Sequence, residues 1–246
     1  MDKGHSNVQR QNGVALWRQI ADRIRTSIAN GDYDATGKVP PEMALAAEFG
    51  VNRHTVRSAL AALAQEGIVR PMQGRGTLIE RKERLTFPIR RRTRFIEGIG
   101  DQAREKEGLL LHSAEEPASA ELAARLQVPE GASVIRLEIV RKADGRAVAR
   151  STAWFPAERF RGLEQAYRDS GSITAAFGKL GLSDYLRAAT EITATHADSG
   201  DLADLKLSPG AIVLVTRALN TDTEGVPVQY AITRFAADRV QFTIEN

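Results

Sequence analysis

The chain has 246 residues, with 34 Lys and Arg against 31 Asp and Glu, a formal net charge of +3 and no cysteine. The lack of cysteine excludes disulfides, iron–sulfur clusters, thiol catalysis and zinc fingers with cysteine ligands. The charge is unevenly divided: residues 1–94 carry 17 basic and 9 acidic side chains, a balance of +8, and residues 95–246 carry 17 and 22, a balance of −5. This division predicts two domains with different partners, one of about 80 and one of about 150 residues.

The sequence contains no run of about 18 apolar residues that could form a membrane helix. Residues 1–13 are polar and lack the apolar core of a signal peptide. We therefore expect a cytoplasmic protein that does not enter a membrane.

The first predicted helix is amphipathic. Leu16, Ile20, Ile24 and Ile28 repeat at a spacing of four, and Asn30-Gly31 ends the pattern. A turn-rich segment follows.

Two shorter helices come next. One is predicted over residues 42–49, after Pro40-Pro41 and before Gly50. The other begins after Asn52, a good N-cap, and ends before Gly67. Its apolar stripe consists of Val56, Leu60 and Leu63. Two short helices joined in this way indicate a helix-turn-helix.

The first turns of the second short helix present Arg53, His54, Thr55 and Arg57. Arg53 and Arg57 are four residues apart and share a face, from which guanidinium groups can bind guanine or phosphate. Thr55 can contact a phosphate or a thymine methyl group. The alternative is an ordinary solvated helix face.

The segment after this helix decides between the two interpretations. Residues 68–70 and 77–79 are β-prone, and the turn over residues 71–76 contains Gly74, Arg75 and Gly76. A hairpin directly after a recognition helix is typical of a wing, whose tip can lie against phosphate or in a narrow minor groove.

Residues 16–79 resemble the winged helix-turn-helix domain of GntR-family bacterial transcriptional regulators. The resemblance rests on five ordered motifs: 16–20 (LWRQI), 39–42 (VPPE), 51–57 (VNRHTVR), 63–67 (LAQEG) and 73–77 (QGRGT). It implies DNA contacts by Glu42, Asn52, Arg53, His54, Thr55, Arg57, Gln73, Gly74, Arg75 and Gly76. Two residues depart from the family pattern, since Pro41 and Asn52 replace serines. Asn52 keeps a capping oxygen, whereas Pro41 removes a hydroxyl and a backbone donor.

We place the DNA-binding domain at residues 1–80, a basic linker at 81–94 and a second domain at 95–246. The linker contains seven basic residues and Pro88, a composition typical of a tether. Residues 90–94 lead directly into the second domain.

The second domain alternates predicted strands and helices. Helices are expected over residues 116–126, 172–180 and 201–205. Strands are expected over residues 133–141, 147–155, 190–196, 211–220 and 227–235, with turns at Asp144-Gly145 and Glu224-Gly225. This order predicts an α+β fold, an antiparallel sheet with helices packed on it.

This domain resembles the ligand-sensing UTRA domain of the HutC-type branch of GntR regulators, whose fold is related to chorismate lyase. Within that branch it is most similar to regulators of phosphonate utilisation. The resemblance rests on residues 92–95 (RTRF), 143–145 (ADG), 154–160 (WFPAERF), 172–177 (SITAAF), 184–190 (DYLRAAT) and 233–239 (TRFAADR).

The resemblance implies an effector site for a small anion, which guanidinium groups and hydroxyls suit. The implied residues are Thr93, Arg94, Arg141, Thr152, Trp154, Gln229, Thr233 and Phe235. Strand alternation agrees in part, because 152 and 154 share one face, as do 229, 233 and 235. The alternatives are core packing for Thr152, Trp154 and Phe235 and a rim salt bridge for Arg141. Arg187 and Arg234 are further candidates, more typical of a surface or interface.

No catalytic, metal-binding or cofactor-binding constellation is apparent. The four histidines, His5, His54, His112 and His196, are scattered, and no Ser-His-Asp order or HExxH motif occurs. We expect a homodimeric repressor that binds double-stranded operator DNA and responds to a small anionic effector. The alternatives are a regulator of sugar-phosphate or amino-acid catabolism, and a lyase-like enzyme fused to a basic module.

Overall fold

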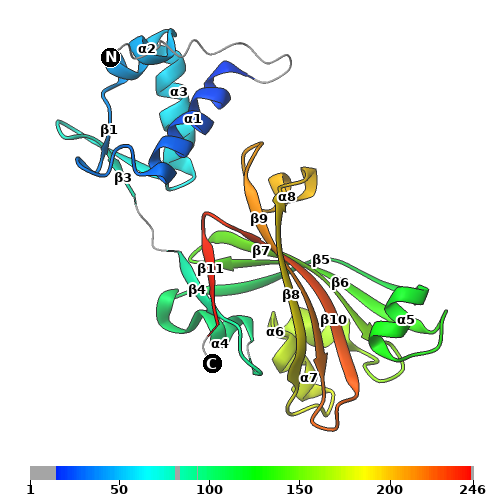
Figure 1. The fold of residues 1–246 in the computed structure, drawn as a ribbon. Helices are drawn as coiled ribbons and strands as arrows, with labels where there is room; N and C mark the ends of the chain where they lie inside the picture. The colour runs from blue at the N-terminus through cyan, green and yellow to red at the C-terminus, as the bar shows by residue number, and fades with distance from the viewer. Residues whose placement is uncertain (1–14, 81–83, 93, 245–246) are drawn as a thin grey trace. The chain divides into compact units, whose positions relative to one another are not determined.

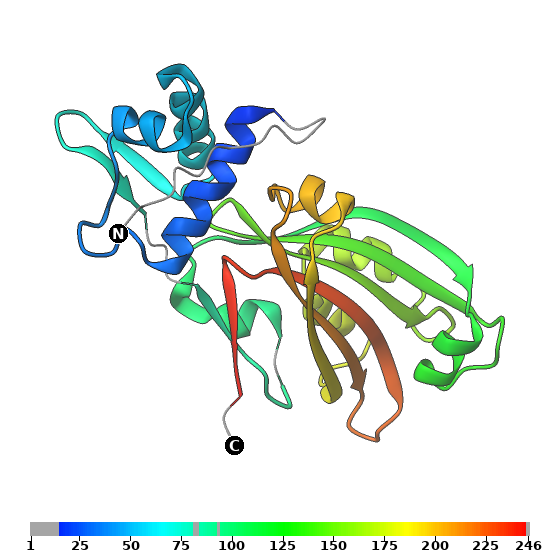
Figure 2. The same ribbon diagram turned by 45° about the horizontal axis from the view of Figure 1, so that its top comes forward.

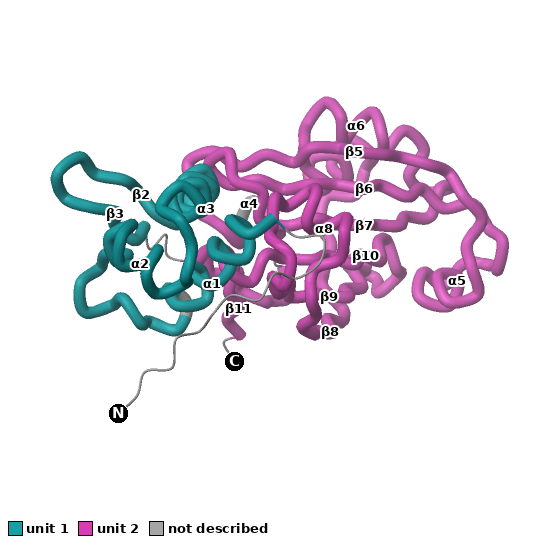
Figure 3. The backbone as a smooth tube through the Cα atoms, turned by 90° about the horizontal axis from the view of Figure 1, so that it is seen from above, with its two compact units in different colours: residues 1–83 teal, residues 84–246 magenta. Residues whose placement is uncertain are grey.

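The computed structural model describes residues 15–80, 84–92 and 94–244. The chain forms two compact units, residues 1–83 and 84–246 (Figure 3). Two domains were also predicted from the sequence, with their boundary at a different position, as described below.

The first unit has three helices and a small sheet among its described residues (Figure 1). The helices are α1 (Leu16–Asn30), α2 (Glu42–Phe49) and α3 (Arg53–Gln65). The strands are β1 (Lys38–Val39), β2 (Val69–Met72) and β3 (Gly76–Ile79), in the order β1-β3-β2. The predicted helices and the hairpin are confirmed; the two-residue strand β1 was not predicted.

Local signals in the sequence fix the ends of these helices. Gly31 ends α1 with a φ of 81°, and Gly50 ends α2 with a φ of 64°, both in the left-handed region that favours glycine. The apolar stripes meet in one core, where each buried aliphatic side chain contributes about 1.5–3 kcal/mol. Its fully buried members include Ile20, Ile24, Leu45, Val56 and Leu63.

The second unit is built on a six-stranded antiparallel sheet with the order β5-β6-β7-β10-β9-β8. The strands are β5 (Lys106–Pro117), β6 (Ser133–Ala143), β7 (Arg146–Pro156), β8 (Leu186–His196), β9 (Ile212–Thr221) and β10 (Pro227–Ala236). A separate parallel pair joins β4 (Leu85–Pro88) to β11 (Val240–Thr243). The predicted α+β class is confirmed.

Short helices cover parts of this sheet (Figures 1 and 2). They are α4 (Phe95–Ile99), a 3-10 turn (Gly100–Gln102), α5 (Ala120–Leu126), α6 (Leu163–Ser170), α7 (Ile173–Lys179) and α8 (Ser199–Asp204). Helices α6 and α7 pack on one sheet face, where Tyr167 and Phe177 meet Leu137 and Phe155 in the main core.

The expected linker over residues 81–94 is corrected by the structure. Leu85 to Pro88 form strand β4, which pairs with β11, and Phe87 is buried against Phe235. The second unit therefore begins at Arg84 rather than at Phe95. The segment was predicted to be a linker because it is rich in arginine. Strand β4 within it is short, and its alternate residues Leu85 and Phe87 are apolar.

The helix expected over residues 116–126 is also partly wrong. Glu116 and Pro117 end strand β5, and the helix α5 starts at Ala120, with Ser119 as its N-cap. The register of β5 shifts between Leu110 and His112, so a bulge interrupts the alternation by which a strand would be recognised.

Candidate nucleic-acid interface and effector pocket

The start of α3 is held by Asn52. Its side-chain oxygen accepts hydrogen bonds from the Thr55 backbone amide at 2.8 Å and from the Thr55 hydroxyl at 2.9 Å. The capping role expected for Asn52 is therefore confirmed. The Thr55 hydroxyl hydrogen is already engaged, so Thr55 offers a ligand its lone pairs and its methyl group.

Glu42, at the start of α2, links the two arginines of α3. Its carboxylate accepts from Arg53 Nε at 2.7 Å and from Arg57 Nε at 3.2 Å and Nη2 at 3.1 Å. The hydrogen bonds from Arg57 and then Arg53 lower the pKa of Glu42. Such exposed pairs contribute little to stability, but they restrict the rotamers of both arginines.

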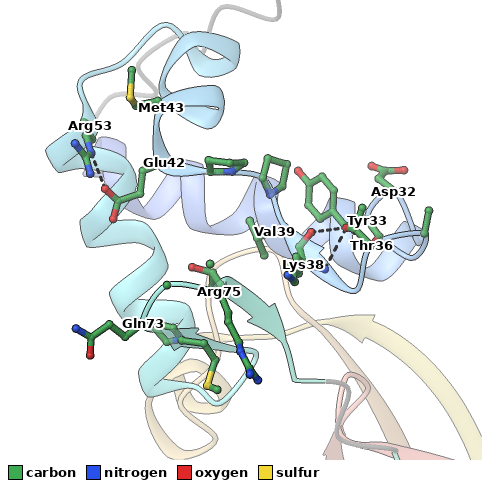
Figure 4. A pocket seen from close by; sticks show the side chains of 18 residues that line it. Asp32, Tyr33, Thr36, Lys38, Val39, Glu42, Met43, Arg53, Gln73 and Arg75 are labelled. Atoms are coloured by element: carbon green, nitrogen blue, oxygen red, sulfur yellow. Dashed lines mark hydrogen bonds and ion pairs between the residues drawn. The ribbon is translucent and has the colours of Figure 1, made fainter.

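The two arginines remain accessible despite these bonds. The Arg53 and Arg57 side chains are 57% and 56% exposed, against 26% for Glu42. His54 is exposed beside them. The pair Glu42–Arg53 therefore presents guanidinium nitrogens outward from a fixed carboxylate (Figure 4).

The wing turn is exposed from Gln73 to Gly76. Gly74 and Gly76 have φ values of 73° and 84°, and an added Cβ would meet nothing within 4 Å at either position. The glycines are thus required by backbone conformation rather than by crowding. Their bare backbone allows a close approach to another molecule.

An open cleft of about 1150 Å³ lies between this wing and the residues that precede α2 (Figure 4). Its lining includes Lys38, Glu42, Arg53, Gln73 and Arg75. Glu42, Arg53 and the wing residues 73–76 thus border one concave surface, whereas Asn52, His54, Thr55 and Arg57 do not belong to its lining.

The second unit holds two adjoining cavities, of about 70 and 270 Å³. They share five lining residues, namely Arg94, Phe95, Arg141, Ile173 and Tyr185. The smaller one is polar, and its lining also includes Ser151, Arg187, Thr216, Asn220, Gln229, Thr233 and Phe235.

Sheet register explains which strand residues reach this pocket. Residues directly opposite on antiparallel strands share a face. Thr233 lies opposite both Ser151 and Thr216, and the Ser151 and Thr233 hydroxyls are 2.7 Å apart. Asn220 lies opposite Gln229 and donates to its side-chain oxygen at 2.7 Å.

The same register corrects the expectation for Thr152 and Trp154. These residues lie opposite Ile232 and Tyr230, on the other face of the sheet. Trp154 donates from Nε1 to Glu116 at 3.0 Å and stacks on Tyr230 with the ring centroids 6.0 Å apart. Alternation showed that 152 and 154 share a face, but it could not show which face bears the pocket.

The remaining expected effector residues divide as follows. Arg94, Arg141, Gln229, Thr233 and Phe235 line the pocket. Thr93 lies outside the described residues. The structure adds Ser151, Tyr185, Thr216 and Asn220, together with Arg187, which the sequence favoured as a surface residue. Arg234 instead binds the buried Asp201, with Nε at 2.8 Å from both carboxylate oxygens.

The pocket is cationic. Its charged lining residues are Arg94, Arg141 and Arg187, and no Asp or Glu belongs to the described lining of either cavity. Arg94 lies 4.8 Å from the Tyr185 ring centroid, and Arg141 lies 4.8 Å from that of Phe95. These aromatic rings hold the guanidinium groups in place without neutralising them.

Arg187 is partly buried in this pocket. Burial lowers its pKa, and its buried Nε atom has no hydrogen-bond partner among the described residues. A buried unpaired donor is costly unless a ligand satisfies it. An anion in the pocket would provide the acceptor that Arg187 lacks.

No helix in the described part of the chain is long and apolar enough to cross a membrane. Among the same residues, no group of three or more His, Asp or Glu side chains is arranged to hold a metal ion.

Known proteins resemble both units. Residues 16–79 match bacterial regulatory proteins of the gntR family, and residues 101–241 match the UTRA domain. The chain is 60% identical to the uncharacterized HTH-type transcriptional regulator RB1450 of Rhizobium meliloti, over 97% of this chain and 98% of the relative. It is 30% identical to the probable transcriptional regulator PhnF of Escherichia coli, over 93% and 92%. The crystal structure of PhnF from Mycobacterium smegmatis matches with a TM-score of 0.62 and 25% identity, over 91% of this chain and 98% of that one.

Proposed function

The chain belongs to the GntR family of bacterial regulatory proteins, with a UTRA domain of the HutC type, and from this premise we propose that it is a DNA-binding repressor released by a small anion. Its relatives are transcriptional regulators rather than enzymes. In the proposal, a cytoplasmic homodimer binds an inverted repeat, because a two-fold symmetric protein matches a two-fold symmetric operator.

The exposed arginine pair of α3 is the observation that carries the DNA-binding proposal. Arg53 and Arg57 are oriented by Glu42 while more than half of each side chain stays accessible. In a helix-turn-helix, this end of the second helix meets base edges in the major groove. A guanidinium held by a carboxylate at Nε can still present its terminal nitrogens to guanine or phosphate.

Selection from random DNA duplexes by the full chain tests this proposal. We expect enrichment of an inverted repeat whose half-sites are about 10 base pairs apart. Arg53→Ala and Arg57→Ala together should abolish the enrichment, whereas Arg168→Ala, on α6 of the second unit, should preserve it. An unchanged selection by the Arg53/Arg57 double variant would contradict the proposal.

The effector class follows from the charges of the pocket. Three arginines without a lining carboxylate favour a ligand with two negative charges, and the hydroxyls and amides of Ser151, Thr216, Asn220, Gln229 and Thr233 provide neutral hydrogen-bonding groups. We therefore favour a phosphonate or a phosphate-containing metabolite of phosphonate uptake or degradation. The similarity to the two PhnF proteins supports this choice.

A sugar phosphate is the second candidate, because the same arginines would bind its phosphate and the same polar groups its hydroxyls. An effector from amino-acid catabolism fits less well, because the lining offers no carboxylate for an ammonium group. A thermal-shift screen of the full chain separates these classes. We expect phosphonates to raise the melting temperature; stabilisation by urocanate alone would contradict an anion of the phosphonate or phosphate class.

A further inference from the structure

Asp184 lies between two arginines at the rim of the effector pocket. Its carboxylate accepts from Arg92 Nη2 at 2.9 Å and Nε at 3.2 Å, and from Arg94 Nη2 at 2.9 Å. Asp184 itself is not part of the pocket lining. One carboxylate thus holds both a residue outside the pocket and a residue that lines it.

The two arginines differ in what surrounds them. The Arg92 side chain is 63% exposed, whereas that of Arg94 is 16% exposed and lies against the Tyr185 ring. The hydrogen bond from Arg92 is the chief cause of the lowered pKa of Asp184, and the charge of Arg94 is a lesser one. Asp184 therefore binds two arginines, of which only Arg94 lines the pocket.

A ligand anion in the pocket would have to bind the Arg94 guanidinium, which is already hydrogen-bonded to Asp184. Guanidinium groups bind phosphonate and phosphate oxygens through paired N–H donors, and an Nη2 atom bound to a carboxylate is only partly available for that pairing. The proposed effector must then compete with an internal carboxylate at Arg94. Arg141 and Arg187 line the same cavity without an ion pair to Asp184 among the described contacts.

We propose that Asp184 is an internal competitor of the effector, a positioning residue that holds Arg94 when the pocket is empty and yields it to the ligand anion. The inference rests on the proposed anion-binding function of this pocket. It predicts that Asp184 sets the effector concentration at which the regulator responds, because ligand binding must first disrupt the Asp184–Arg94 ion pair.

Backbone contacts tie this exchange to strand β8. The Arg187 amide donates to the Arg91 carbonyl at 2.7 Å, so the residues just before Arg94 are bonded to strand β8. Release of Arg94 would change the contacts of the segment between β4 and α4, which lies within the second unit.

Titration calorimetry of the full chain with methylphosphonate and with inorganic phosphate tests the proposal. Asp184→Asn should tighten binding by about three- to tenfold, because the ligand no longer competes with the Asp184 carboxylate for Arg94. Arg92→Gln should weaken binding by a similar factor, because Asp184 then relies on Arg94 alone. Asp169→Asn is the matched control, since this exposed acid pairs with Gln165 and Lys179, and it should leave affinity unchanged.

A double-mutant cycle separates competition from a long-range charge effect. In an Arg94→Gln background, Asp184→Asn should have no effect on affinity; an effect as large as in the wild type would overturn the proposal. Equal binding by wild type and Asp184→Asn would overturn it while leaving the anion-sensing function intact. If neither probe binds any variant at millimolar concentrations, the anion-sensing function fails as well. If Asp184→Asn does not fold, Arg92→Gln replaces it in the cycle. Arg92→Gln should weaken anion binding in the wild type and should have no effect on affinity in the Arg94→Gln background.

Discussion

Glu42 is an acidic residue within the proposed DNA-binding surface. Its negative charge opposes phosphate, yet its carboxylate fixes Arg53 and Arg57 through three hydrogen bonds. Orientation of a guanidinium matters most where two N–H groups must meet one base, and least where a phosphate is bound by charge. The residue should therefore contribute more to specificity than to affinity.

Replacement of Glu42 by Gln tests that distinction. We expect roughly tenfold weaker binding to the selected operator, within the 1–3 kcal/mol of one bidentate base contact, and equal or tighter binding to scrambled DNA. Fluorescence anisotropy with both duplexes measures the ratio. Glu48 is an exposed acid on the same helix, and Glu48→Gln should change neither affinity. An unchanged ratio of operator to scrambled-DNA affinity in Glu42→Gln would contradict the orienting role of Glu42.

The positions of Arg141 and Trp154 lead to a second prediction at this scale. Arg141→Gln should weaken effector binding at least about tenfold, because it removes a charge from the pocket lining. Trp154→Phe should leave effector affinity unchanged, because Trp154 lies on the sheet face away from the pocket. It should lower the free energy of unfolding by about 1 kcal/mol, because it removes the hydrogen bond to Glu116. Calorimetry and chemical denaturation measure the two quantities; a loss of affinity in Trp154→Phe would contradict its placement.

Among the elements, helix α8 depends on its cap. Asp198 accepts from the Asp201 amide and Asp201 from the Asp198 amide, a reciprocal capping box. The Asp201 amide is the chief cause of the lowered pKa of Asp198, and Arg234 and Arg150 add to it. A lowered folded-state pKa stabilises the fold above the unfolded-state pKa, and this stabilisation is lost as pH falls through the folded-state value.

Asp198→Ala should therefore lower the free energy of unfolding by about 1 kcal/mol at pH 7. The difference from the wild type should shrink on acidification below the ordinary range of an aspartate, because the wild type then loses its charged cap. Thermal melts of both proteins across acidic pH measure this. If the difference in stability between the wild type and Asp198→Ala grew as the pH fell, the predicted pH dependence would be wrong.

Strand β4 gives a second test at the scale of elements. Phe87 is buried and contacts the rings of Phe95, Phe235 and Phe242. Phe87→Ala should lower the free energy of unfolding of the second unit by about 3–5 kcal/mol. A fragment of residues 84–246 should melt cooperatively, whereas one of residues 95–246 should melt at a lower temperature; equal melting would show that β4 is dispensable.

Elements with strong local signals could be predicted, and those without could not. Helices α1, α2 and α3 have apolar stripes and ends marked by Gly31, Gly50 and Asn52. Strand β5 has a bulge within three consecutive leucines, and β4 is short and flanked by arginines, so neither shows clean alternation. Strand β4 also depends on a partner distant in sequence, β11.

The site shows the same division. Residues of the recognition helix and wing are close in sequence, so their motif could place them together. The pocket joins residues from β7, β9 and β10 with Arg94 and Arg187, and its side of the sheet depends on where α6 and α7 pack. Thr152 was expected from the family resemblance. Alternation shows which residues of a strand share a face but not which face bears the pocket, so it could not replace Thr152 with Ser151.

For the whole molecule, the uneven charge predicts salt-dependent DNA binding. Residues 1–94 carry a balance of +8 and the rest a balance of −5, so the basic part would displace counterions from DNA. Operator affinity should fall at least about tenfold between 50 and 200 mM salt. Anisotropy titrations at several salt concentrations measure the slope, and a flat affinity would contradict binding to the phosphate backbone.

The pairing of β4 with β11 sets an order for synthesis of the protein. Leu85 lies beside Val240, so the strand that opens the second unit can pair only after residues 86–239 have been synthesised. The first unit, whose contacts are local, can fold as soon as it leaves the ribosome. A nascent chain can thus fold its helix-turn-helix unit before β4 has its partner, and a stop codon ahead of Val240 would leave that first unit intact and β4 unpaired.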